Sequence, residues 1–533
     1  MKTCFRRLIL IAFLATVALT AVFALSACND LKTASDTLIV GTTTVINSLN
    51  RLASSGGDHG YNYTMLSATL AQVPLVYKAE DGYDSVLFDV TSPSGTKYVF
   101  KLKADFYWHD GTPVTARDTA FTLESTLGST AEITVGDDAV SVEFESAKPT
   151  FLEGLTSVLL MPEHILQGET AATISDEKSV VGCGPFKFLS RNISAGTVEF
   201  EKFDKYPYAD SVSLNKIVFR QFNSEDVMRL ALKSGEIDMI WNYGSGLKAD
   251  AVSDLSGADN INLISYAVKA VPKTLFFNNA KVNDARIKRA IRKAIDYDKI
   301  RRIFGTAASS LPREGFVAPT VFGYAQTAEL TRDLEGAKAL LSEAGYNRDN
   351  KYKFEILVRT DNNDTQYADL IKTDLEETGL IAVGLKRAAG VAQWQEYYMS
   401  GKHTASLASV TEAGYNFDAG YATRYLLAKD NYVMRDAFAN GNPVCHGNID
   451  IGERGSLTVF GKIREALSEA QNQDELKDAA KNYQNYIVEE SPMIALIYDE
   501  RVQAANKKID GIRVDVTFGI LNVQSLISLK KTV

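Results

Sequence analysis

Polar and apolar residues alternate in one part of this chain and recur at helical spacing in others. The run KYVFKLK, residues 97–103, alternates and predicts a half-buried antiparallel strand. An Asp110-Gly111 turn follows, and Thr115 with Asp118 has the spacing of a capping box that begins a helix. We therefore expect residues from about 63 to 185 to form short strands with a few helices, an α+β unit.

A helix beginning at the expected cap Asp284 has the clearest two-faced pattern. Its apolar positions predict a buried face, and they are Ile287, Ala290, Ile291, Ala294 and Ile295. Its basic positions are Lys288, Arg289, Arg292 and Lys293. At this periodicity we expect the basic face to be solvated rather than to contact phosphate or nucleic acid.

Further along, strand and helix patterns alternate. A helix over about 333–344 stops at Gly345, and a strand over 352–359 follows. A helix over about 364–378, ended by Gly379, then leads to a strand over 381–386, which predicts a βαβ unit with parallel strands. Amphipathic helices from about 458 to 488 end before Pro492. The pattern indicates a multi-lobed α/β protein that begins with a strand at Thr37.

The start of the chain carries a long uncharged apolar run. Leu8 to Ala24 follows basic residues and precedes the small-residue pair Ser26-Ala27 and Cys28, the arrangement of an export signal. It resembles a bacterial lipoprotein signal, which implies cleavage after residue 27, lipid on Cys28 and a tether over 28–36. An uncleaved transmembrane anchor is the alternative. Either way, we expect the remainder at the outer face of the cytoplasmic membrane.

Composition narrows the classes of function. The 533 residues are 45% hydrophobic and 23% charged, as in globular proteins with a real core. The formal net charge is -9, and it becomes -12 without residues 1–27, which hold three basic and no acidic residues. An acidic surface argues against nucleic acid as a partner. Nothing after residue 28 is apolar for long enough to cross a membrane.

Cysteine and histidine are sparse. Cys183 and Cys445 remain after the signal, and they form either a disulfide or two buried small side chains. The five histidines show no metal-ligand spacing, so we expect no metal site and no cofactor.

Six spaced segments resemble the family 5 extracytoplasmic solute-binding proteins of ABC importers, which include oligopeptide-, dipeptide- and nickel-binding proteins. They keep the family's order, behind the lipoprotein-like signal. The segments are YVFKLKADFYWHDGTPVTARD (98–118), GCGPF (182–186), LKSGEID (232–238), FFNN (276–279) with DARIKRAIRKAID (284–296), AKALLSEAGY (337–346) and Pro492 to Tyr498.

The resemblance implies an α/β fold of two hinged lobes, the type II periplasmic-binding-protein fold of the large cluster, with an extra α+β domain inserted in the first lobe. The expected boundaries are 1–27 for the signal peptide, 35–62, 186–270 and 500–533 for the discontinuous lobe I, 63–185 for the inserted domain and 271–499 for lobe II.

In such a fold the ligand is enclosed between lobes, so we expect polar and aromatic residues at strand ends facing the cleft. Three segments are candidates, each against a purely structural interpretation as turn or core residues. The candidate residues are Thr43 and Thr44 after Thr42, Trp241, Asn242 and Tyr243, and Ser409, Thr411, Glu412, Gly414, Tyr415 and Asn416.

The last segment departs from the resemblance. In peptide-binding members an aspartate before a tyrosine holds the ammonium of the peptide, and here Gly414 stands at that position. The family's upstream tryptophan is also missing. Glu412 lies two residues earlier, on the same face of an extended chain, displaced by about 6–7 Å. We therefore hypothesise that Glu412 supplies the carboxylate.

The resemblance implies a non-enzymatic, monomeric, lipid-anchored protein that captures peptides and delivers them to a permease with its ATPase. A nickel or metal-chelate ligand is the alternative within the family. An exported peptidase and a surface receptor without transport are alternatives of another class. The chain has no Gly-x-Ser-x-Gly elbow and no His-Glu-x-x-His helix, which argues against the common hydrolases.

Overall fold

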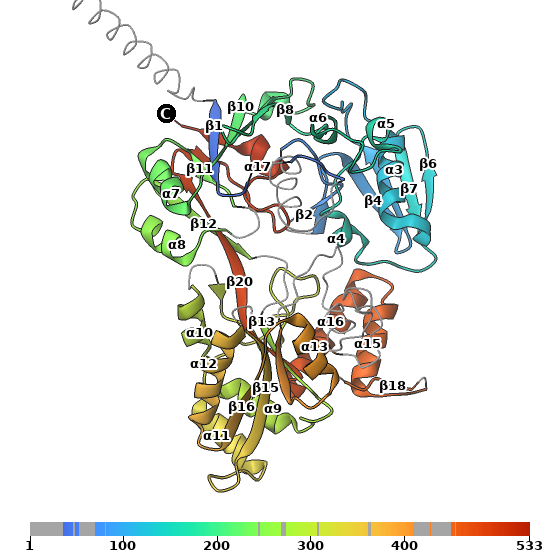
Figure 1. Ribbon diagram of the computed structural model, residues 1–533. Helices are drawn as coiled ribbons and strands as arrows, with labels where there is room; N and C mark the ends of the chain where they lie inside the picture. The colour runs from blue at the N-terminus through green and yellow to red at the C-terminus, as the bar shows by residue number, and fades with distance from the viewer. Residues whose placement is uncertain are drawn as a thin grey trace, which may run out of the picture.

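The protein has an upper and a lower half joined through one long strand (Figure 1). The computed structural model describes residues 36–532, apart from 46–47, 53–69, 80–81, 243–245, 268–272, 306–308, 361–363, 409–426, 428–448 and 454. We call the part around β1 (Thr37–Thr42), strands β8–β11 (within residues 186–240) and α3 (Ala116–Leu127) the upper half. The part around β13 (Lys273–Phe277), strands β15–β17 (within residues 352–408) and α9 (Ala285–Ala294) is the lower half.

Twelve described strands form a single mixed sheet that extends through both halves. Ten of them lie in one path: β16 (Ile381–Ala388), β15 (Tyr352–Arg359), β17 (Ala405–Ala408), β13 (Lys273–Phe277), β20 (Met493–Asn506), β11 (Met239–Ile240), β1 (Thr37–Thr42), β10 (Lys216–Gln221), β9 (Thr197–Lys202) and β8 (Phe186–Asn192). The other two strands, β12 (Ile261–Ala267) and β14 (Ser309–Ser310), pair with β20.

Strand β20 belongs to both halves. Its first residues pair with β13, from Met493 opposite Phe276 to Ile497 opposite Lys273. Its last residues pair with β12 and β11 in the upper half. Figure 1 shows this strand running between the halves. The predicted boundary between residues 499 and 500 falls inside β20, and the predicted domain limits as a set stay predictions.

The βαβ unit predicted from the alternating patterns is confirmed. Strands β15 and β16 are parallel and in register over their whole length, and helix α12 (Asp364–Glu376) connects them. Helix α11 (Leu334–Glu343) precedes the unit, capped by Asp333. Gly345 and Gly379 both have positive φ, as expected for residues that follow the end of a helix.

Helix α9 (Ala285–Ala294) confirms one part of its prediction and corrects another. Asp284 caps it by accepting from the Arg286 N–H, and the predicted apolar face is buried. The basic face is not solvated throughout, because Lys288 is 4% exposed and Arg292 is 6% exposed. The reason is that α9 packs against α11 and also against α16 (Gln473–Glu490), which comes almost 200 residues later.

A second sheet lies in the upper half and is formed by residues within 63–185, the range predicted to form an α+β unit. Helix α3 (Ala116–Leu127) packs against it and is capped by Thr115, whose N–H donates to the Asp118 carboxylate. The predicted alternation in β5 is confirmed by the burial of Tyr98 and Phe100. The sheet order is β4 (Phe88–Ser94), β5 (Lys97–Leu102), β7 (Ala139–Glu143) and β6 (Glu132–Val135).

Short elements complete both halves. In the upper half these are β2 (Tyr77–Ala79), β3 (Gly82–Asp84), α4 (Phe151–Leu155), α5 (Glu163–Leu166), α6 (Asp176–Ser179), α7 (Glu225–Ser234), α8 (Ala249–Ser256), β21 (Ile509–Asp510), α17 (Val523–Ser528), β22 (Lys530–Lys531) and 3₁₀ turns at Gly128–Thr130 and Ala209–Ser211. In the lower half they are α10 (Tyr297–Phe304), α13 (Val391–Met399), β18 (Gly452–Glu453), β19 (Ser456–Leu457) and α15 (Val459–Glu469).

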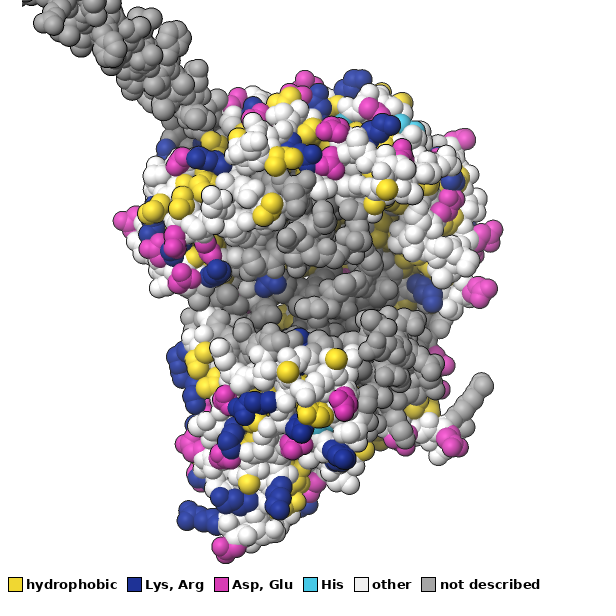
Figure 2. Space-filling view, viewed as in Figure 1, with side chains coloured by type: hydrophobic (Ala, Val, Ile, Leu, Met, Phe, Trp, Pro, Cys, Tyr) yellow, Lys and Arg dark blue, Asp and Glu magenta, His cyan; other side chains and the backbone are white. Residues whose placement is uncertain are grey.

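The molecular surface is hollowed between the two halves (Figure 2). Each half has its own large core. One cluster of buried residues joins Leu38 and Val40 of β1 to Phe100 of the second sheet and to Trp108, which lies beyond the end of β5. Another packs α9, α11 and α12 against β13 and β15. Two halves that each have their own core and share strand β20 are an arrangement in which a hinge motion can occur.

Candidate functional site

The strand ends of β1 and β11 bring two predicted site residues together. The Asn242 side-chain oxygen accepts from the Thr43 N–H at 3.0 Å and from the Thr43 hydroxyl at 3.3 Å. It also accepts from the Thr42 hydroxyl at 3.1 Å. These residues meet because β1 and β11 are parallel neighbours, so their carboxyl ends share one edge of the sheet.

Thr44 continues this turn. Its N–H donates to the Thr42 hydroxyl at 3.1 Å, and both Thr43 and Thr44 are partly buried. A threonine hydroxyl that accepts from the backbone two residues on is a turn-stabilising contact. The hydrogen bonds of the threonines are thus those expected of turn residues. The threonines nevertheless lie at the strand edge where we expected a ligand site.

Asn242, which follows β11, forms hydrogen bonds to β20 as well as to the end of β1. Its backbone N–H donates to the side-chain oxygen of Gln503 on β20 at 3.0 Å, and its carbonyl accepts from the Gln503 amide at 2.9 Å. Asn242 itself is 3% exposed. Its amide therefore fixes the geometry of this edge.

Trp241 lies in the core of the upper half. It is fully buried, and a Cβ on Gly519 would come within 2.2 Å of its ring. This close packing favours the interpretation of Trp241 as a core residue over its interpretation as a residue that lines the ligand site.

The other predicted site residues lie outside the described residues. They are Cys28, Tyr243, Ser409, Thr411, Glu412, Gly414, Tyr415 and Asn416. Strand β17, which ends at Ala408, pairs with β13 and β15 in the lower half. The candidate segment therefore begins at the end of a central strand of that half, and its assignment stays a prediction.

Two of the segments that resemble the family, 98–118 and 182–186, contact each other through His109 in the upper half. The Gly182 N–H donates to Nδ1 of His109 at 3.3 Å, and Nε2 of His109 lies 3.0 Å from the Gly184 carbonyl. A Cβ on Gly182 would be 1.9 Å from the Ala71 carbonyl oxygen. Sequence reasoning missed this role of His109, and burial lowers its pKa to about 4. Cys183 between the glycines is buried with a free thiol, and Cys445 lies outside the described residues.

Asp238, at the end of the LKSGEID segment, anchors β1. Its carboxylate accepts from the Ile39 N–H at 2.8 Å and from the Lys531 ammonium at 2.9 Å. Both side chains are about nine-tenths buried. The turn before it needs Gly235, which has a φ of 78° after α7. Sequence reasoning had placed these residues in a motif without identifying the Lys531 partner.

Two negative findings concern the part of the chain that the structure describes. Three or more His, Cys, Asp or Glu side chains do not gather there in a way that could hold a metal ion. Among the described helices, none combines the length and apolar character needed to span a bilayer.

Residues 79–432, about two thirds of the chain, match the family model described as "Bacterial extracellular solute-binding proteins, family 5 Middle". The chain belongs to this family. The resemblance in the sequence is confirmed, and family 5 is a family of solute-binding proteins rather than of enzymes.

Curated relatives of this family 5 protein carry peptide-binding names. A proposed ABC transporter peptide-binding protein of Brucella ovis is 26% identical over 332 residues, which cover 57% of this chain and 59% of that protein. The dipeptide-binding protein DppE of Bacillus subtilis is 21% identical over 467 residues, 79% of each chain. The chain thus spans less than two thirds of the Brucella relative.

Solved structures share the family 5 fold over most of this chain. HbpA2 of Haemophilus parasuis matches with a TM-score of 0.75 at 17% identity, over 93% of this chain and 100% of that one. DppA of Helicobacter pylori in complex with the peptide STSA matches with a TM-score of 0.60 at 21% identity, over 93% and 98%. The predicted two-lobed α/β periplasmic-binding-protein fold is confirmed.

Proposed function

We propose that this chain is the substrate-binding component of an ABC importer and that it captures peptides between its two halves. The observation that carries the proposal is family 5 membership together with the peptide-binding names of the curated relatives. The hollow between the halves supports it, because a ligand held there contacts both halves only when they approach each other.

The proposal includes a location and partners. Lipid on Cys28 would hold the protein at the outer face of the cytoplasmic membrane, where a permease with its ATPase subunits would receive the closed form. We propose a monomer, since one chain supplies both sides of the hollow. A charged ligand enclosed there must find partners of opposite charge, because desolvation otherwise exceeds the gain from binding.

A direct test is mass spectrometry of ligands that co-purify with the full-length chain. We expect peptides with free N-termini. A nickel ion or a metal chelate as the predominant ligand would replace the peptide proposal with the alternative for which relatives such as NikZ of Campylobacter jejuni, solved with Ni(L-His), are named. Hydrolysis of added peptides by the purified chain would favour the exported peptidase instead.

Glu412 gives a residue-level test of the same proposal. If its carboxylate holds the ammonium of a peptide, Glu412→Gln weakens binding of a free-amine peptide by about tenfold or more and leaves its N-acetylated form nearly unchanged. Calorimetric titration of the two peptides measures both affinities. Glu489→Gln, an exposed change on α16, is the matched control. Equal losses for the two peptides would contradict this role of Glu412.

A further inference from the structure

A second cavity lies in the lower half, away from the strands that cross between the halves. It has a volume of about 330 Å³ and is lined by Asn279, Ala280, Asn283, Lys288, Ile449, Asp450, Tyr486 and Glu490. Asn279 follows β13 at the end that pairs with Met493, whereas Ile497 marks the end of the pairing nearer the upper half. The cavity is therefore separate from the hollow between the halves.

Lys288 is the buried cation of this cavity. Its side chain rises from α9, and its ammonium donates to the side-chain oxygen of Asn279 at 3.0 Å. An ammonium has three N–H donors, and the described residues supply no second hydrogen-bond acceptor to it. Burial lowers the pKa of Lys288 to about 8, while Glu490 and Asp284 act in the opposite direction. The group is thus a desolvated cation with donors to spare.

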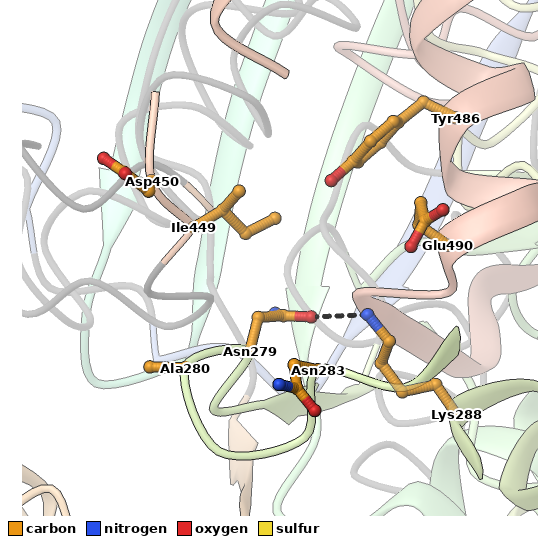
Figure 3. A pocket seen from close by; sticks show the side chains of 8 residues that line it. All are labelled: Asn279, Ala280, Asn283, Lys288, Ile449, Asp450, Tyr486 and Glu490. Atoms are coloured by element: carbon orange, nitrogen blue, oxygen red, sulfur yellow. Dashed lines mark hydrogen bonds between the residues drawn. The ribbon is translucent and has the colours of Figure 1, made fainter. Parts of the chain in front are cut away.

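Glu490 supplies the opposite charge near the end of α16. Figure 3 shows its carboxylate and the Lys288 ammonium directed at the same space from two helices. No ion pair joins these two described side chains, although Glu490 attracts Lys288 electrostatically. Two opposite charges that face one cavity without direct contact leave room for a group between them.

The remaining walls are part polar and part apolar. The Tyr486 hydroxyl and the Ile449 side chain point into the cavity, while the Asp450 carboxylate points away from Lys288 (Figure 3). Burial, with a contribution from Glu490, raises the pKa of Tyr486 to about 12, so its hydroxyl keeps its proton and can donate. An anion alone would be repelled by Glu490, and a cation alone by Lys288.

We propose that this cavity binds a small zwitterion of the α-amino acid class, with its carboxylate at Lys288 and Tyr486 and its ammonium at Glu490. An apolar side chain of the ligand would lie against Ile449. The volume is at the lower limit of small-molecule sites, roughly 300–1,000 Å³, which suits a single amino acid rather than a longer peptide. This site does not depend on the proposed transport function.

The test is calorimetric titration of the full-length chain with L-leucine, N-acetyl-L-leucine and L-leucinamide. We expect L-leucine to bind and each derivative, which lacks one charge, to bind at least about tenfold more weakly. Lys288→Met and Glu490→Gln should each weaken L-leucine binding by a similar factor. Lys481→Met and Glu489→Gln, exposed changes on α16, are the matched controls and should leave it unchanged.

Thermal melts of each variant identify any loss of folding, and Glu490→Gln remains informative if Lys288→Met is unstable. L-leucine binding should persist when the chain is saturated with a co-purified or added peptide, because that ligand would occupy the hollow between the halves. Absence of L-leucine binding to the wild-type chain would overturn the proposal. So would binding that Glu490→Gln leaves intact or that the peptide abolishes.

Discussion

Gly182 allows two backbone segments to approach each other more closely than any other residue would. A Cβ at this position would meet the Ala71 carbonyl oxygen at 1.9 Å, and one at Gly184 would meet backbone oxygens at 2.8 Å. The Gly184 N–H donates to the Ala71 carbonyl at 2.8 Å, so the contact is part of the hydrogen-bond network. The glycines of the GCGPF segment are therefore explained by packing of the upper half.

We expect Gly182→Ala to lower the free energy of unfolding by more than about 2 kcal/mol, because the backbone of residue 71 or 182 must move. Urea unfolding followed by circular dichroism measures the change. The control is Gly257→Ala, where φ is -88° and no atom lies within 4 Å of the new Cβ. A loss in Gly182→Ala no greater than in this control would contradict the packing role.

His109 makes the upper half sensitive to acid. Burial lowers its pKa to about 4 in the folded chain, from 6.5. Between pH 6.5 and 4 the unfolded chain therefore binds a proton that the folded chain does not, and the free energy of unfolding falls as the pH falls through this window.

His109→Gln should make this fall less steep, as measured by urea unfolding at pH 7, 6, 5 and 4. Some slope remains, because burial also lowers the pKa of His403 to about 4. An identical pH dependence in His109→Gln and the wild-type chain would rule out this assignment.

At the scale of elements, the end of the chain is tied to its first strand. Lys531 on β22 donates to the Asp238 carboxylate and to the Thr37 carbonyl at 3.0 Å. Asp238 in turn holds the Ile39 N–H of β1. One buried ion pair thus joins β22, β1 and the turn before β11, segments that are almost 500 residues apart at the extremes.

Lys531→Met should lower the free energy of unfolding by about 3–5 kcal/mol, because it leaves the Asp238 carboxylate buried without its cation. Adding Asp238→Asn should recover part of the loss, since it removes the unpaired charge. Chemical denaturation of the single and double variants measures both effects, with Lys530→Met, an exposed neighbour, as control. A double variant less stable than Lys531→Met would argue against charge burial as the cause.

For the whole molecule, β20 determines how the halves can move. It pairs with β13 on one side of the hinge region and with β11 and β12 on the other. Each half keeps its own core, so closure can change the angle between halves without repacking either of them. The hollow in Figure 2 is the space that such a motion would reduce.

We expect small-angle X-ray scattering to show a smaller radius of gyration when the purified chain binds a peptide mixture. The ligand favours the closed form through contacts that the open form lacks. L-leucine serves as the control, because the cavity beside Lys288 lies within the lower half and its occupation would not bring the halves together. Peptide binding without any compaction would contradict closure.

Local patterns determined much of this fold before any tertiary contact was known. The caps Thr115 and Asp284, the turn glycines Gly345 and Gly379, and the parallel β15–α12–β16 unit all follow from interactions within a few residues or one periodic face. Side chains at one strand edge were also predictable in part, since Thr43 and Asn242 meet where parallel strands end.

Only the tertiary structure decided which polar side chains are buried and which distant residues they contact. The sequence of α9 could not show that Lys288 and Arg292 are buried, because their cover comes from α16, far along the chain. Nor could it show that His109 meets Gly182 or that Lys531 reaches Asp238. Helical and strand periodicity encodes which face of an element is apolar, whereas burial of a polar face depends on elements that approach it from elsewhere in the chain.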